Sequence, residues 1–314
     1  MWALKMQLED KRATAEAVYE LIRQRINPLK NGGALAKTPE VESKIIAKIE
    51  TMMLQELPIH MVIPAFPAKS ANREKTLGHL PDMGEVLALK NLNGLCDEIS
   101  ALYAAGAEIT ICSDGRVFND LVLVSDTAVS AYQASLHQII KKFGLNSLNT
   151  FNLDDVLTDF NFFEMREELM RKYALSQEEL RAKIQTSPQE AQLFNGIHRF
   201  IFEDRVVLAP AKSREKTRNE SKAVAYEVVR RSQAWSALVE EKFPHSLRLS
   251  IHPQSESSEK IGVRLLPSEN HWRTPWHSVV LIKGDSPSLV SRKEAIEQGA
   301  KLKFMDDTYG FYDV

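Results

Sequence analysis

Apolar residues recur at every third or fourth position along several long stretches of the chain, which is the spacing of one helical face. Residues 8–27 and 39–57 both follow this spacing. Thr38 and Pro39 suit the N-cap and the first helical position of the second stretch. The pattern therefore predicts a helical segment over residues 1–57, ahead of the rest of the chain.

Short apolar runs between turn-forming residues follow, and they alternate with helical patterns. Residues 59–66 (IHMVIPAF) are closed by prolines and residues 108–112 (EITIC) run into a Ser-Asp-Gly turn, so both are expected to be buried strands. Helical patterns cover 88–105 and 125–143, and a further short strand is expected near 148–153. This alternation predicts an α/β sheet whose strand ends carry the functional site.

The middle of the chain, residues 154–204, is charged and helical with little strand pattern, and a long helix over about 216–242 follows. Strand candidates then return at 247–252, 261–266, 277–283 and near Leu302. We expect residues 58–314 to form one compact α/β unit with a helical insertion, because no low-complexity linker interrupts them.

Composition narrows the range of partners. The 314 residues carry a formal net charge of −2, so no global field favours nucleic acid or anionic lipid, and a local positive patch suits a small phosphorylated metabolite. Cys96 and Cys112 make neither a disulfide framework nor a structural zinc set. No apolar run approaches the length of a membrane span and the first residues lack the pattern of a secretory signal, so we expect a cytoplasmic protein.

One short motif occurs twice, as PAKSANREKT at 67–76 and as PAKSREKT at 210–217. Each copy offers backbone N–H groups, hydroxyls and cationic side chains, as phosphate-binding loops do. Neither copy has the glycines of a P-loop, and basic, hydroxyl-rich loops are also common on protein surfaces. We expect the two loops to meet at one rim of the sheet and to share one anion. The candidate anion-binding residues are Lys69, Ser70, Arg73, Lys75, Lys212, Ser213 and Arg214.

Candidate acid–base residues lie near the first copy and after the second predicted strand. His79 and Asp82 follow the first copy closely, which suits proton transfer beside a bound phosphate. Asp82 is at least as well suited to cap a helix, with Glu85 completing an Asp-x-x-Glu capping box. Asp114 stands at the end of the strand 108–112, where α/β folds place functional side chains, although Asp-Gly is also a common turn.

Two later motifs add polar and aromatic candidates. In LRLSIHP, Arg248, Ser250 and His252 alternate with apolar residues and share one strand face, which predicts a polar pocket. In TPWH, Trp276 and His277 stand at a strand start, with aromatic packing around a hydrogen-bonded histidine as the alternative. The histidines lack metal-ligand spacing, and the chain has neither a Gly-rich dinucleotide fingerprint nor a GxSxG elbow. A metal site, a nicotinamide enzyme and a serine hydrolase are therefore disfavoured.

Taken in order, these motifs resemble the pyoverdine/dityrosine biosynthesis family, and within it the bacterial isonitrile (isocyanide) synthases. The resemblance is carried by IPAFPAKSANREKTLGHLPDMGE, ICSDGRVFNDL, APAKSREK, RRSQAWSALVEEKFP, LRLSIHP and TPWH, over roughly residues 58–280. It implies a Rossmann-like α/β fold with additional helices. It also implies an enzyme that joins the α-amino group of an aromatic amino acid to a carbon of ribulose 5-phosphate and leaves an isonitrile, with no metal and no organic cofactor.

The implied chemistry gives the candidate residues expected roles. Attack of the amine on the sugar ketone needs a general acid and base, and phosphate loss needs cationic partners. The residues expected at the phosphate and the developing oxyanions are Lys69, Arg73, Lys75, Lys212 and Arg214. Those expected to transfer protons are His79, Asp82, Asp114 and His252, with Trp276 as an aromatic wall.

The amino-acid substrate and the partners follow from the same resemblance. L-Tyrosine is favoured over L-tryptophan, although both need an apolar slot and differ in one polar tip. We expect small-molecule partners, no nucleic acid and no membrane, and the oligomeric state is open. The alternative hypothesis is a non-catalytic binding protein for a phosphorylated metabolite.

Overall fold

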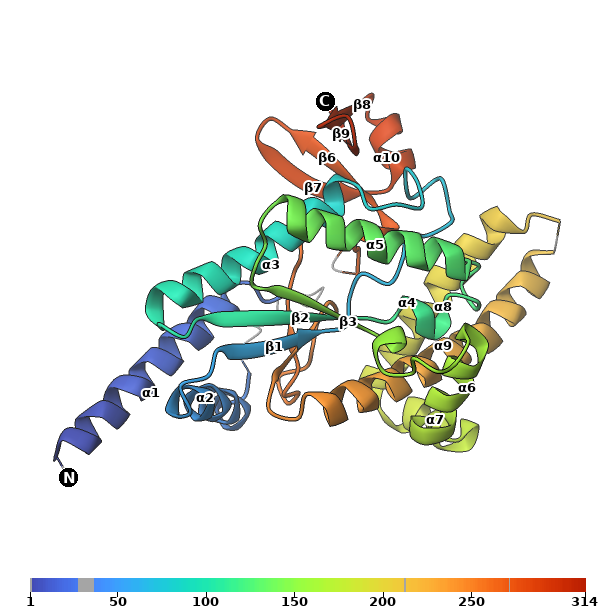
Figure 1. Ribbon diagram of the computed structural model, residues 1–314. Helices are drawn as coiled ribbons and strands as arrows, with labels where there is room; N and C mark the ends of the chain where they lie inside the picture. The colour runs from blue at the N-terminus through green and yellow to red at the C-terminus, as the bar shows by residue number, and fades with distance from the viewer. Residues whose placement is uncertain (1, 28–36, 212, 271) are drawn as a thin grey trace.

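Figure 1 shows the computed structural model, which describes residues 2–27, 37–211, 213–270 and 272–314. The strands of these residues form two separate sheets. The central sheet contains β1 (Ile59–Ile63), β2 (Ala107–Ser113), β3 (Leu148–Asn152), β4 (Leu247–Ser250) and β5 (Ile261–Gly262). The second sheet contains β6 (Val279–Lys283), β7 (Ser286–Val290), β8 (Lys301–Met305) and β9 (Tyr309–Asp313).

The central sheet is parallel throughout and has the strand order β3-β2-β1-β4-β5. The chain builds this sheet outwards from β1 to β3, and then returns to the other side of β1 to form β4 and β5. Such a reversal leaves a crevice at the carboxyl ends of the strands beside it, here β1 and β4.

Helices surround the central sheet and form the long return connection from β3 to β4 (Figure 1). They are α1 (Trp2–Arg23), α2 (Pro39–Leu54), α3 (Met83–Leu102), α4 (Gly115–Phe118), α5 (Asp126–Lys142), α6 (Phe162–Tyr173), α7 (Gln177–Thr186), α8 (Pro188–Leu208) and α9 (Arg214–Lys242). A further helix, α10 (Arg292–Glu297), packs against the second sheet. Two short 3-10 turns are η1 (Leu153–Asp155) and η2 (Pro275–His277). In the described part of the chain no helix is both long and apolar enough to cross a bilayer.

Alternate residues of β1 face two different apolar clusters. Met61 and Ile63 belong to the main cluster, which also contains residues of α1, α2, α3 and α5. Val62 belongs to a second cluster with Trp235 of α9 and residues of α6. Because side chains alternate across a strand, both faces of β1 are buried, as expected for the centre of a parallel sheet.

The mixed α/β fold with a parallel central sheet is confirmed. Thr38 caps α2, because its hydroxyl accepts a hydrogen bond from the Val41 N–H at 3.4 Å. The region 154–204 is helical as predicted, and it supplies α6, α7 and most of α8. The strand predicted over 261–266 is wrong in its length, since β5 ends at Gly262.

The second sheet was not predicted as a separate unit. It has the order β7-β6-β9-β8, and Val280 and Tyr309 join it to the main apolar cluster. Strands were predicted at 277–283 and near Leu302, but not at β7 and β9. Their sequences, SPSLV and YGFYD, contain the Pro, Ser, Gly and Asp residues that usually mark turns.

Candidate active site

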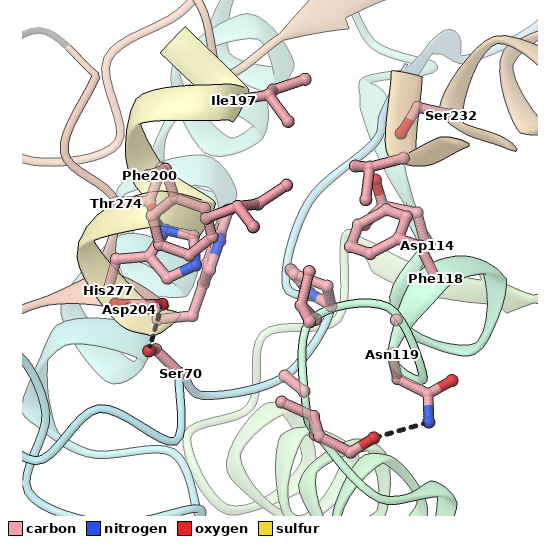
Figure 2. A pocket seen from close by; sticks show the side chains of 18 of the residues that line it. Ser70, Asp114, Phe118, Asn119, Ile197, Phe200, Asp204, Ser232, Thr274 and His277 are labelled. Carbon is pink, nitrogen blue, oxygen red and sulfur yellow. Dashed lines mark hydrogen bonds between the residues drawn. The ribbon is translucent and has the colours of Figure 1, made fainter. Parts of the chain in front are cut away.

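A cavity opens at the carboxyl ends of β1, β2 and β4, where the strand order of the central sheet reverses. It holds about 1050 Å³ of empty space, counting its open mouth. Figure 2 shows Phe200 and His277 on one side of this space and Asp114, Phe118 and Ser232 on the other. The polar side chains that line it are Ser70, Asp114, Asn119, Asp204, Ser232, His252, Thr274 and His277. Its aromatic side chains are Phe118, Phe200, Trp272 and Trp276.

The loops after β1 and β2 lie very close together at the cavity edge. Phe66 has a left-handed backbone with φ of 55°, and its carbonyl accepts a 2.8 Å hydrogen bond from Ser113 Oγ. A Cβ atom on Gly115 would lie 2.0 Å from the carbonyl oxygen of Pro67. Only glycine fits there without a shift of the backbone, and this close approach holds the neighbouring Asp114 beside the cavity.

Asp114 is half-buried and has a carboxylate without a partner. Among the described residues, no other residue donates a hydrogen bond to this carboxylate or forms an ion pair with it, and it does not cap α4. Burial raises the pKa of Asp114 to about 7. A carboxyl group with that pKa both gives and accepts a proton near neutral pH, which is the property of a general acid–base catalyst.

His252 lies just beyond the end of β4 and is held neutral. Its ring packs against Trp272 with ring centroids 4.7 Å apart, and its buried Nδ1 atom has no hydrogen-bond partner among the described residues. Burial lowers the pKa of His252 to about 4. The imidazole is therefore an uncharged group that lines the cavity, while its unpartnered Nδ1 atom lies below the cavity surface.

His277 lines the side of the cavity next to α8. Its Nδ1 atom is 3.2 Å from Thr274 Oγ1, and its ring lies 4.0 Å from the ring of Phe200. Burial is the largest cause that keeps the pKa of His277 well below its usual value, and the positive charges of Lys75 and Lys69 add to it. This histidine is therefore also neutral.

One end of the cavity is polar and is organised by Asp204 of α8. Asp204 accepts hydrogen bonds from Ser70 Oγ at 3.0 Å and from Asn72 Nδ2 at 2.9 Å, and it forms an ion pair with Lys75 Nζ at 2.8 Å. Lys75 also lies 4.6 Å from the centre of the Phe200 ring. These contacts join the loop after β1 to α8, so the two parts of the chain form one wall (Figure 2).

The first PAKS copy differs from the prediction at its lysine. The Lys69 side chain is fully buried, and its ammonium contacts Asp82 at 2.8 Å and Glu85 at 2.9 Å. Lys69 therefore has no surface to offer a phosphate, and its predicted role as an anion ligand is wrong. Asp82 forms the capping box with Glu85, so the capping interpretation is confirmed. Asp82 does not line the cavity, so it is not a proton-transfer group there.

Other predicted residues lie away from the cavity. His79 and Arg73 are exposed on the loop before α3. Arg248 faces α9 instead, where it contacts Glu240 at 2.9 Å and Ser236 at 3.0 Å. The shared face of LRLSIHP breaks because β4 ends at Ser250, so His252 is no longer part of the strand alternation.

The second PAKS copy does not meet the first. Ser213 caps α9, accepting a hydrogen bond from the Lys216 N–H, and Arg214 stacks on Phe202 at 5.7 Å. Both residues are exposed and neither lines the cavity. Figure 1 shows the start of α9 at the far end of the α8–α9 hairpin, away from the strand ends. Lys212 lies outside the described residues.

Several lining residues were missed by the sequence analysis. Asp204, Phe200 and Ser232 belong to α8 and α9, and Phe118 belongs to the short helix α4. In the sequence Asp204 stands between Glu203 and Arg205, so no local signal distinguished it from a surface carboxylate. In the described ranges, no group of three or more His, Cys, Asp or Glu side chains is arranged to hold a metal ion.

Comparison with known proteins identifies the family. Residues 49–303 match the model of the family described as pyoverdine/dityrosine biosynthesis protein. The chain therefore belongs to the pyoverdine/dityrosine biosynthesis family, as the motifs indicated.

Bacterial members of this family are similar over most of their length. The chain is 46% identical over 257 residues to L-tryptophan isonitrile synthase AmbI2 of Fischerella ambigua, covering 82% of this chain and 78% of the relative. It is 40% identical over 273 residues to an L-tyrosine isonitrile synthase of Pseudomonas aeruginosa, covering 83% of each. The crystal structure of PvcA from Pseudomonas aeruginosa matches with a TM-score of 0.88 and 34% identity, covering 96% of this chain and 99% of that one. The similarity to bacterial isonitrile synthases is thus confirmed, and the protein is an enzyme of that group.

Proposed function

We propose that the protein converts the α-amino group of an aromatic L-amino acid into an isonitrile and takes the added carbon from ribulose 5-phosphate. The observation that carries the proposal is the cavity at the strand ends, where the partner-free carboxylate of Asp114 and the neutral His252 face an aromatic-lined space. The parallel strand order with its reversal between β1 and β4 supports a Rossmann-like sheet with its ligand at this crevice.

The first chemical step is a condensation that suits these two residues. The amine nitrogen bonds to the ketone carbon, and the ketone oxygen leaves as water with the two amine protons. Asp114, with a pKa of about 7, takes a proton from the nitrogen and returns it to the departing oxygen. His252 is neutral and lines the cavity, so its ring hydrogen-bonds the substrate oxygen in this proposal.

The amino-acid side chain fits the aromatic part of the cavity. Phe118, Phe200 and Trp276 offer flat apolar faces, and Ser232 adds one hydroxyl. Such a slot accepts a phenol or an indole, and the similar enzymes from Fischerella and Pseudomonas are named for tryptophan and tyrosine respectively. L-Tyrosine stays our predicted substrate, with L-tryptophan as the direct competitor.

The sugar phosphate fits the polar end near Asp204. With Lys69 buried, the phosphate contacts proposed for the first copy reduce to Ser70 and Lys75. Lys75 keeps its ion pair with Asp204 and also contacts the phosphate in this proposal, so its ammonium lies between the two anions. We propose that no metal and no organic cofactor take part, so exhaustive chelation is expected to leave the activity unchanged.

The test is mass spectrometry of the purified protein incubated with ribulose 5-phosphate and L-tyrosine or L-tryptophan in turn. We expect an isonitrile product, whose added carbon carries the isotope when the sugar is labelled. Asp114→Asn is expected to slow the reaction about 10²- to 10⁴-fold while the protein stays folded. If a folded sample binds ribulose 5-phosphate but produces no isonitrile with any aromatic amino acid, the non-catalytic binding protein is correct instead.

A further inference from the structure

A closed group of charged side chains lies directly behind the cavity wall. The Lys69 side chain is 0% exposed, and those of Asp82 and Glu85 are 6% and 0% exposed. The ammonium of Lys69 contacts Asp82 Oδ2 at 2.8 Å, Glu85 Oε2 at 2.9 Å and the carbonyl of Pro275 at 2.9 Å. Three acceptors match the three N–H groups of a lysine, so this lysine is fully satisfied inside the protein.

The cluster joins parts of the chain that are distant in sequence. Tyr132 of α5 donates a 3.0 Å hydrogen bond to Glu85 Oε1, and the other Glu85 oxygen accepts from the Asp82 N–H at 2.9 Å. The first turn of α3, the middle of α5, the loop after β1 and the segment before β6 therefore meet at one buried point. We call Lys69, Asp82, Glu85 and Tyr132 the buried cluster.

The buried cluster sets the distance between two segments that line the cavity. Lys69 holds the carbonyl of Pro275, and the next residue, Ser70, donates its N–H to the carbonyl of Trp276 at 2.9 Å. Two successive residues of one segment thus bind two successive carbonyls of the other. Ser70 and Trp276 line the cavity, as does the following His277.

The packing around Pro275 leaves little freedom for this arrangement. A Cβ atom on Gly84 in the first turn of α3 would lie 3.3 Å from the Cβ of Pro275. Trp276 is 2% exposed and packs against Phe66 with ring centroids 5.2 Å apart. Lys69 therefore ties a closely packed segment to the loop after β1, and a small shift at Pro275 is passed on to Trp276 and His277.

We propose that the buried cluster positions the segment 274–277 at the cavity, which makes Lys69 a positioning residue for the cavity-lining Trp276 and His277 instead of a phosphate ligand. This inference rests on the proposed function only in taking the cavity as the catalytic site. A displacement of about 1 Å in such a segment is enough to cost about a hundredfold in rate. Binding of the sugar phosphate, which uses other residues, is expected to change little.

The test compares Lys69→Met with the double variant Lys69→Met/Glu85→Gln. The single variant leaves two buried carboxylates without their cation, so it is expected to be strongly destabilised. The double variant removes one of these charges and is expected to regain much of the stability. The matched control is Lys216→Met, an exposed lysine of the second PAKS copy.

We expect kcat of the double variant to stay about a hundredfold below wild type while its KM for ribulose 5-phosphate stays within about threefold. A purely stabilising role predicts that kcat returns together with stability, and a phosphate-ligand role predicts a raised KM with an unchanged kcat. Either result would overturn the proposal.

Amide hydrogen exchange gives a readout that does not depend on turnover. Exchange at residues 274–278 is expected to be faster in the double variant than in wild type, and unchanged in Lys216→Met. If neither Lys69 variant folds, Asp82→Asn takes their place, because asparagine also caps helices but removes the charged partner of Lys69. Unchanged exchange at 274–278 in a folded variant contradicts the proposal, whereas a lack of isonitrile from wild type contradicts only the proposed function.

Discussion

The two copies of the PAKS motif have nearly the same sequence, but the first is largely buried and the second is mostly exposed to solvent. In the first copy, Lys69 is buried between two carboxylates and Ser70 lines the cavity. In the second copy, Ser213 caps an exposed helix and Arg214 stacks on a neighbouring ring. The residues around each copy decide the difference. The first copy follows the central strand of a parallel sheet and precedes the capping box of α3, whereas the second copy lies between two long helices.

The largest expected difference between the copies is in stability. Lys69→Met leaves Asp82 and Glu85 buried without their cation, and breaking a buried ion pair costs about 3–5 kcal/mol. Lys216→Met changes an exposed side chain and is expected to stay within about 0.5 kcal/mol of wild type. Urea unfolding of both variants measures the contrast. Equal effects in the two variants would mean that the first copy is not buried as described.

The close approach of the first copy to the loop after β2 gives a second test. Gly115→Ala places a methyl group 2.0 Å from the carbonyl oxygen of Pro67, so the loops must separate. We expect about a hundredfold loss of isonitrile formation, because Asp114 moves with its neighbour. Gly94→Ala on α3 is the matched control, since nothing lies within 4 Å of its added Cβ. It is expected to stabilise the helix by about 0.5–1 kcal/mol and to leave the rate unchanged.

The two serines of the motif separate binding from folding. Ser70→Ala removes the hydroxyl that bonds Asp204 and is expected to raise the KM for ribulose 5-phosphate about tenfold. Ser213→Ala removes a helix cap and is expected to cost about 1 kcal/mol of stability with no change in KM. Steady-state kinetics measure the KM of both variants, and thermal unfolding measures their stability. A raised KM in Ser213→Ala would restore the idea that the copies share an anion.

The dependence of stability on pH reports on the buried cluster of the first copy. Burial is the main cause that raises the pKa of Asp82 to about 7, so its contribution to stability is lost as pH rises from about 4 through 7. The raised pKa of Asp114 also lowers the stability as pH rises, whereas the lowered pKa of His252 increases the stability as pH rises. We expect Asp82→Asn to lose less stability than wild type between about pH 5 and about pH 8. An identical loss in the two proteins would show that Asp82 does not titrate in this range.

The sequence predicted the elements of the central sheet better than the contacts between them. Strands such as 108–112 and helices such as 125–143 are encoded by local periodicity, and both lie within a few residues of their predicted bounds. The placement of Asp114 at a strand end followed from the fold class. The burial of Lys69 could not be predicted, because Pro275 is 206 residues away and the carboxylates beside it already had a local role in the helix cap. The aromatic residues that α8 contributes to the cavity were missed because the charged pattern of the region gave no sign that one helix face lines a cavity.

The distance in sequence between Lys69 and Pro275 has a consequence for synthesis of the chain on the ribosome. The first PAKS loop emerges 206 residues before the carbonyl that completes its set of contacts. Until then the lysine keeps its water or only its carboxylate neighbours, although the last strand of the central sheet, which ends at Gly262, has already been made. This wall of the cavity is therefore completed late in translation, and a chain that stops before the TPWH segment lacks the cavity-lining residues Thr274, Trp276 and His277.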